Sequence, residues 1–147
     1  MKQLLCVVDF SDSTAKVLEI AGRIASGYKA HLVVLFPYRL IDYAYRGDIT
    51  ALKLRLESEA KEKFQELKKN IPALQNVSCE FQPEIGFIFD RITSNLKKNK
   101  TEMIIIGQQQ TVTINDLKGV SLQNLISGSK LPFVIVPEVK SPEAVLE

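Results

Sequence analysis

The chain has 147 residues, of which 46% are hydrophobic and 24% charged, so we expect one ordinary globular domain with its own core. A formal net charge of +2 is too small to predict a nucleic-acid partner or an anionic membrane surface. No apolar run approaches the roughly 18 residues of a membrane-spanning helix, and the N-terminus lacks a signal-peptide cleavage site. Two isolated cysteines, Cys6 and Cys79, lie in apolar runs and favour inert thiols in a reducing cytoplasm.

The first third of the chain predicts a strand, a helix and a second strand. Residues 4–8 are all apolar, which is typical of a strand buried on both faces of a parallel sheet. Apolar residues then recur with helical spacing to about Tyr28, and Gly27 suits the end of that helix. Residues 31–36 predict the second buried strand. Pro37 should end it, because proline has no N–H to donate to a sheet ladder.

The middle third predicts an irregular segment, a long helix, an edge strand and a second helix. Residues 49–70 place apolar side chains on one stripe and charged ones elsewhere, as in an amphipathic helix. Residues 77–82 alternate in polarity, which favours a strand at the edge of the sheet, and residues 83–86 predict a turn. Residues 87–99 predict a helix with a cationic end, Lys97-Lys98-Asn99-Lys100. That end either complements the helix dipole and aids solubility or forms a phosphate or nucleic-acid patch.

In the last third, residues 103–106 predict a buried strand that runs into Gly107 and three glutamines. A short helix over residues 117–127, ending near Gly128, and a strand over residues 133–136 follow. We expect a domain over residues 1–138 and a C-terminal tail over residues 139–147. Strands that alternate with helices predict an α/β domain, in which right-handed crossovers place helices on both faces of an open parallel sheet.

Ligands of open α/β sheets bind beyond the carboxyl ends of the strands. The candidates are therefore Asp9 and Ser11, together with residues 36–38, 84–86 and 107–110. Asp9 either accepts a hydrogen bond from a ligand, such as the exocyclic amine of a purine, or, with Ser11 or Asp12, satisfies the free N–H groups of the next helix. Catalysis and metal binding are not expected. The single histidine, His31, begins a strand at the opposite end, and the chain contains no Gly-x-x-x-x-Gly-Lys-Ser/Thr motif.

Taken in order, these segments resemble the universal stress protein family over nearly the whole chain, to about Pro137. The resemblance rests on Val7-Val8-Asp9-Phe10-Ser11-Asp12, His31-Leu-Val-Val-Leu-Phe36, Glu84-Ile85-Gly86, Met103-Ile-Ile-Ile-Gly107 and Leu131-Pro-Phe-Val-Ile-Val-Pro137. It implies five parallel strands ordered 3-2-1-4-5, with Asp9 and Gly107 facing one crevice. It also implies a homodimer through the last strand, with Val134, Ile135 and Val136 at the interface, where an unpaired strand edge would otherwise be exposed.

Members of that family that bind ATP carry Gly-x-x-Gly, nine residues, then Gly-Ser/Thr, which hold the phosphates. Here Gln110 stands at the second glycine, the segment from Gly107 to Gly119 is one residue short, and Val120 precedes Ser121. Glycines let backbone N–H groups approach phosphate closely, so glutamine side chains should crowd that approach. The polar run after Gly107 is alternatively a surface loop without a ligand.

We therefore expect a cytoplasmic, dimeric, non-catalytic binding module of the stress response. It should not hold ATP in the usual way, and its protein or small-molecule partner is not identified by the sequence. The alternative is a protein that binds ATP or another adenine nucleotide through a remodelled phosphate loop. The residues that would then contact the nucleotide are Asp9, Ser11, Phe36, Gly107, Gln110, Gly119 and Ser121.

Overall fold

The computed structural model describes residues 2–40, 47–115 and 120–139. The strands are β1 (Gln3–Val7), β2 (His31–Tyr38), β3 (Cys79–Ile85), β4 (Met103–Gly107) and β5 (Phe133–Val136). The helices are α1 (Thr14–Tyr28), α2 (Ile49–Lys69), the short 3₁₀ helix η1 (Pro72–Leu74), α3 (Ile88–Lys98), α4 (Gln108–Asn115) and α5 (Leu122–Ser129). No helix in the described ranges combines the length and the apolar character that crossing a bilayer requires.

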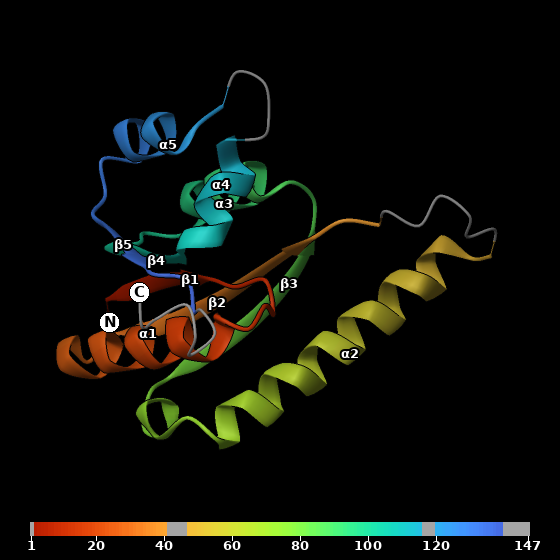
Figure 1. Ribbon diagram of the computed structural model, residues 1–147, viewed down its shortest axis with the longest axis horizontal. Coiled ribbons are helices and arrows are strands. Elements are labelled where there is room, and N and C mark those ends of the chain that lie inside the picture. Colours follow the sequence, from red (N-terminus) through yellow and green to blue (C-terminus); the bar gives the residue numbers. More distant parts are fainter. Residues whose placement is uncertain (1, 41–46, 116–119, 140–147) are drawn as a thin grey trace, which may run out of the picture.

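The strands form one parallel sheet in the order β3-β2-β1-β4-β5, which confirms the expected topology. Helices α1 and α2 cover one face of the sheet, and α3, α4 and α5 cover the other (Figure 1). Side chains of a strand alternate between the two faces, so β1 supplies both cores. Leu4 and Cys6 pack on the α1 side, and Leu5 and Val7 pack on the α3 side.

The reversal of strand order lies at β1, which has β2 on one side and β4 on the other. Val7 is in register with Leu35 of β2 and with Ile106 of β4. The carboxyl ends of these three strands therefore meet at one edge. In sheets of this kind that edge, at the reversal of order, is where ligands bind.

The prediction that Pro37 ends the second strand is wrong, because β2 continues to Tyr38. The Leu35 carbonyl accepts a hydrogen bond from the N–H of Val8, just after β1. The Tyr38 carbonyl accepts one from the N–H of Gly86, just after β3. The backbone groups of successive strand residues point alternately to the two neighbouring strands. The backbone nitrogen of Pro37 therefore faces the β1 side, but beyond Val7, the last residue of β1. The N–H that proline lacks would have had no ladder partner at that position.

The turn predicted over residues 83–86 is also shorter than expected. β3 continues through Pro83 to Ile85, and only Gly86 turns the chain, with φ of 143°. β3 pairs with β2 alone and is an edge strand, as its alternating pattern predicted. Proline is tolerated in such a strand when its N–H position faces away from the neighbouring strand.

The predicted ends of two helices, at about Tyr28 and near Gly128, are confirmed to within a residue, but neither glycine takes the left-handed conformation that ends the helix. The left-handed residues that follow α1 and α5 are Lys29 (φ 52°) and Lys130 (φ 58°), whereas Gly27 and Gly128 lie inside the last helical turns. The helix expected over residues 117–127 begins later, at Leu122, and residues 116–119 lie outside the described residues.

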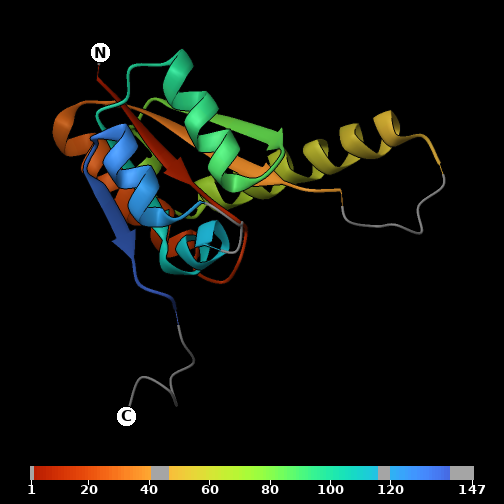
Figure 2. The same ribbon diagram turned by 90° about the horizontal axis from the view of Figure 1, so that it is seen from above.

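The long helix expected over residues 49–70 is confirmed as α2, and its stripe is buried at Leu52, Ala60 and Phe64. The Phe64 ring stacks on Phe81 of β3 at a centroid distance of 4.8 Å. The first turns of α2 project beyond the sheet (Figures 1 and 2), and Leu54 there is exposed. The second half of α2 therefore anchors the helix against the sheet.

Candidate functional site

An aromatic cluster stands at the carboxyl ends of β1 and β2. Phe10 follows β1 in the left-handed conformation, with φ of 58°, which is costly for a residue with a large side chain. Its ring packs edge-on against Phe36, at 4.8 Å between centroids, and against Phe81, at 5.9 Å. Phe36 in turn stacks on Tyr38 at 5.7 Å. These ring contacts hold the strained turn after β1 in place.

Asp9 precedes that turn and is bound within its own loop. Its Oδ1 accepts hydrogen bonds from the Ser11 backbone N–H, at 2.9 Å, and from the Thr14 hydroxyl, at 3.3 Å. Contrary to one of its two interpretations, Asp9 therefore does not cap α1, because the Ser11 N–H lies ahead of the helix and the group on Thr14 is a hydroxyl. The Ser13 side chain makes no hydrogen bond that caps α1. The Asp9 carboxylate is exposed, so part of it still faces the crevice.

A hollow of about 330 Å³ opens beside Asp9. It is lined by Phe10, Phe36 and Tyr38, by Arg39, and by Lys63 of α2. Its volume falls at the lower end of the range for small-molecule pockets, and flat aromatic walls suit a planar ring. On the other side of Phe10, Ser11 lines a second hollow of about 430 Å³ together with Lys63.

Tyr38 closes one wall of the first hollow and is fixed by α2. Its hydroxyl donates to Glu57 Oε2 at 2.5 Å. Burial, followed by the hydrogen bond to Glu57 and the charge of its carboxylate, raises the pKa of Tyr38 well above its usual range. Tyr38 therefore stays protonated at neutral pH and acts as a hydrogen-bond donor, not as a base.

The segment after β4 differs from the expected loop. Gly107 is the last residue of β4, and α4 begins directly at Gln108, so the polar run is neither a phosphate loop nor a surface loop. Gly107 is buried beside Val17, and an added Cβ would lie 3.4 Å from that side chain, an ordinary contact. Gln110 is only 5% exposed, inside the first turn of α4. Helical hydrogen bonding competes with the open loop that an anion cradle needs.

The first two glutamines of α4 bind the chain that follows β5. Gln108 Oε1 accepts from the Glu138 backbone N–H at 3.0 Å, and Gln109 Nε2 donates to the Glu138 carboxylate at 2.7 Å. One residue further, the Val139 N–H donates to Ser13 Oγ at 2.9 Å. We call Glu138 and Val139 the clasp. No local pattern in the sequence indicated these contacts, which join the last residue of the predicted domain and the first residue of the predicted tail to α4 and Ser13.

The predicted site residues therefore separate into groups. Asp9 and Phe36 line one hollow, and Ser11 lines the adjacent one. Gly107 and Gln110 belong to the strand-to-helix junction and line neither hollow. Ser121 is the N-cap of α5, and its hydroxyl accepts from the Asn124 N–H at 3.1 Å; Gly119 lies outside the described residues. Sequence reasoning missed the roles of Phe10, Lys63 and the clasp.

His31 begins β2, at the opposite end of the sheet from this crevice, as expected. Its Nδ1 lies 2.7 Å from the Ser78 hydroxyl, and its Nε2 lies 3.7 Å from the Glu80 carboxylate. The histidine is therefore engaged by residues near the start of β3, away from Asp9 and Phe36.

Comparison with known proteins agrees with this fold. The sequence profile of the universal stress protein family matches residues 1–137, whereas no curated protein matches significantly. A protein of that family from Burkholderia pseudomallei has a TM-score of 0.68 at 14% identity, over 93% of this chain and 96% of its own. A universal stress protein in complex with cAMP has a TM-score of 0.66 at 21% identity, over 92% and 96%. The universal stress protein from Archaeoglobus fulgidus in complex with dAMP has a TM-score of 0.55 at 16% identity, over 92% and 97%. The chain described here belongs to the universal stress protein family.

Proposed function

We propose that the protein is a cytoplasmic, non-catalytic binding module of the stress response that acts as a homodimer and does not hold ATP in the family's usual way. The observation that carries this proposal is the contact between Glu138 and the start of α4. The N-terminus of a helix carries a partial positive charge and attracts anions. Here the Glu138 carboxylate accepts a hydrogen bond from the side chain of Gln109, in the first turn of α4, and would repel a phosphate brought to that helix end.

A second candidate function is the binding of an adenine nucleotide through its base. The hollow beside Asp9 favours it, because aromatic walls and a carboxylate suit the face and the exocyclic amine of a purine. The solved structures with cAMP and dAMP support the same class of ligand for relatives of this fold. Lys63 and Arg39 line the hollow, beside the carboxylate of Glu59, and would meet a phosphate outside the usual cradle.

Thermal-shift measurements with ATP, AMP, cAMP and adenosine separate the two candidates. A ligand at about 100 times its Kd stabilises a protein by about 2.7 kcal/mol, which corresponds to about 5–10 °C for a domain of this size. We expect no such shift with ATP. A clear shift with ATP would overturn the first proposal. A shift with AMP, cAMP or adenosine that Phe36→Ala abolishes would establish the second.

The clasp can be tested in the same assay. Glu138→Gln keeps the size of the side chain and removes its charge, so it should leave the fold intact and remove the repulsion. If the carboxylate excludes phosphate, ATP should stabilise Glu138→Gln more than wild type. Glu102→Gln is the matched control, because Glu102 is exposed and lies just before β4, at the opposite end of the strands from the clasp. An equal ATP response in all three proteins would contradict the role of the clasp.

The homodimer rests on the free edge of β5. In the described part of the chain β5 pairs only with β4, and Ile135 is 42% exposed on a strand whose outer backbone groups are unpaired. Edges of this kind invite pairing with a second strand. Sedimentation velocity should give a dimer at micromolar concentration, and Ile135→Lys should dissociate it. A strict monomer would refute this part of the proposal.

A further inference from the structure

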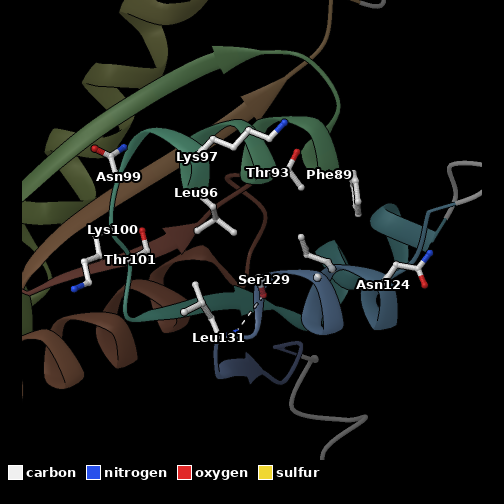
Figure 3. A pocket seen from close by; sticks show the side chains of 12 residues that line it. Phe89, Thr93, Leu96, Lys97, Asn99, Lys100, Thr101, Asn124, Ser129 and Leu131 are labelled. Carbon is white, nitrogen blue, oxygen red and sulfur yellow. Dashed lines mark hydrogen bonds between the residues drawn. The ribbon is translucent and has the colours of Figure 1, made fainter.

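A cavity separate from the crevice lies on the other face of the sheet, between α3 and α5. Its volume is about 530 Å³, within the range of pockets that take small molecules. Figure 3 shows Leu96 of α3 and Leu131 after α5 pointing into this space, with Thr101 toward one end and Phe89 at the other. We call it the α3–α5 cavity.

The α3–α5 cavity has apolar and polar walls, since Thr93, Asn99, Asn124 and Ser129 line it beside four large apolar side chains. Phe89, Leu96, Leu125 and Leu131 line it, and their side chains extend a hydrophobic surface along the groove between the two helices. Gly128 opens one wall, because no heavy atom lies within 4 Å of the position that a Cβ would take there. An apolar ligand body would gain free energy by covering these side chains.

The rim of the cavity is cationic. Lys97 and Lys100 line it, whereas no aspartate or glutamate does. Neither ammonium group forms an ion pair with a carboxylate in the described part of the chain. Long lysine stems let the charged groups move over the opening. The charge of the rim therefore selects an anionic end group on a ligand whose body is apolar.

Thr101 adds a second, independent observation. Thr101 lines the cavity and is 7% exposed as a residue, whereas its hydroxyl oxygen is buried and has no hydrogen-bond partner within the described ranges. Buried hydroxyls are nearly always paired. Rotation about the Cα–Cβ bond exchanges the hydroxyl with the methyl group, so an acceptor inside the cavity would give the hydroxyl the partner that it lacks.

We propose that the α3–α5 cavity binds a small amphiphilic carboxylate of the medium-chain fatty acid class. Its hydrocarbon body lies along Leu96, Leu125 and Leu131. Its carboxylate lies at the rim, near Lys97, Lys100 and Thr101. The proposal is independent of the nucleotide question, because the cavity and the Asp9 hollow lie on opposite faces of the sheet and share no residue.

Titration calorimetry with sodium decanoate, below its micelle concentration, tests the proposal against two probes of equal chain length. Decanol lacks the charge, and decyltrimethylammonium reverses it. We expect saturable binding of decanoate at one site per chain, weaker binding of decanol and none of the cation. Absence of saturable decanoate binding, or equal affinity for the cation, would overturn the proposal.

Two sets of variants locate the site. Gly128→Leu should fill the cavity without a clash and abolish decanoate binding, whereas Gly27→Leu, a glycine with equally free surroundings near the end of α1, should bind as wild type does. The double variant Lys97→Gln/Lys100→Gln should weaken decanoate about tenfold and leave decanol unchanged. Circular dichroism and Tm verify that each variant folds. Undiminished binding by folded Gly128→Leu would place the ligand elsewhere and refute the site.

Discussion

Gly22, in the middle of α1, lies where the helix meets η1 too closely for any side chain. A Cβ at this position would stand 2.8 Å from the Ala73 carbonyl oxygen and 3.0 Å from Leu74 Cδ2. The nearest obstacle is backbone, so Gly22→Ala must displace η1 from the helix. Overpacking of this kind costs about 1–3 kcal/mol, and the better helix propensity of alanine returns about 1 kcal/mol. We expect a net loss of up to about 2 kcal/mol in the free energy of unfolding.

Urea denaturation measures this loss as a lower midpoint with an unchanged slope. Gly27→Ala is the control, since it makes the same chemical change five residues later in the same helix with nothing within 4 Å. It should raise the free energy of unfolding by about 0.5–1 kcal/mol. All three proteins are compared at one concentration, because dimerisation would shift the apparent stability. A Gly22→Ala protein as stable as Gly27→Ala would refute the close packing of α1 on η1.

Three further predictions concern side chains in the interior. Tyr38→Phe removes the hydrogen bond to Glu57 and should lower the free energy of unfolding by about 1 kcal/mol near pH 7. Because the folded-state pKa of Tyr38 is raised, this group should lower the stability of the wild type by up to about 1.4 kcal/mol per pH unit above about pH 10. Tyr38→Phe should lack this loss, whereas Tyr28→Phe, at an exposed tyrosine, should retain it. Identical stability-versus-pH curves for the three proteins would contradict the assignment. Thr101→Val should raise the free energy of unfolding by about 1 kcal/mol, measured by urea denaturation, because it removes an unpaired buried hydroxyl; a loss of stability would mean that the hydroxyl is paired. Cys6 is buried, and burial raises its thiol pKa, so a thiol reagent should modify it only as the protein unfolds; rapid labelling of Cys6 in the native protein would contradict its placement.

Much of the fold could be predicted because its inner strands are short and largely apolar. β1, β2 and β4 sit inside the sheet, and burial on both faces leaves a continuous hydrophobic signal. β3 alternates in polarity and lies at the edge, as that pattern indicated. The errors occurred at prolines. Pro37 and Pro83 were read as breakers, but each occupies a strand position at which a missing N–H costs no ladder bond.

The site was less predictable than the fold. Asp9 and Phe36 were placed correctly at one edge, because both follow strands whose carboxyl ends must meet there in a parallel sheet. The segment after Gly107 was predicted as a loop, because α/β proteins place a phosphate-binding loop where a strand ends in glycine before a helix. Its helix gains support from contacts with distant residues, including Ile114 against the core and Gln109 against Glu138. Such tertiary contacts override a local signal of three polar residues.

The sequence by itself determined the class of fold and the edge where a ligand would bind, because periodicity and strand order are properties of short segments and their succession. Only the tertiary structure decided what occupies that edge. Glu138 of the clasp contacts Gln108 and Gln109 of α4, about thirty residues earlier in the chain. Val139 contacts Ser13, just before α1 and 126 residues earlier. Hydrogen bonds between such distant residues leave no local pattern, since they depend on where the folded chain brings its ends. For the same reason the α3–α5 cavity, which two separate helices create, became visible only once they were packed on the sheet.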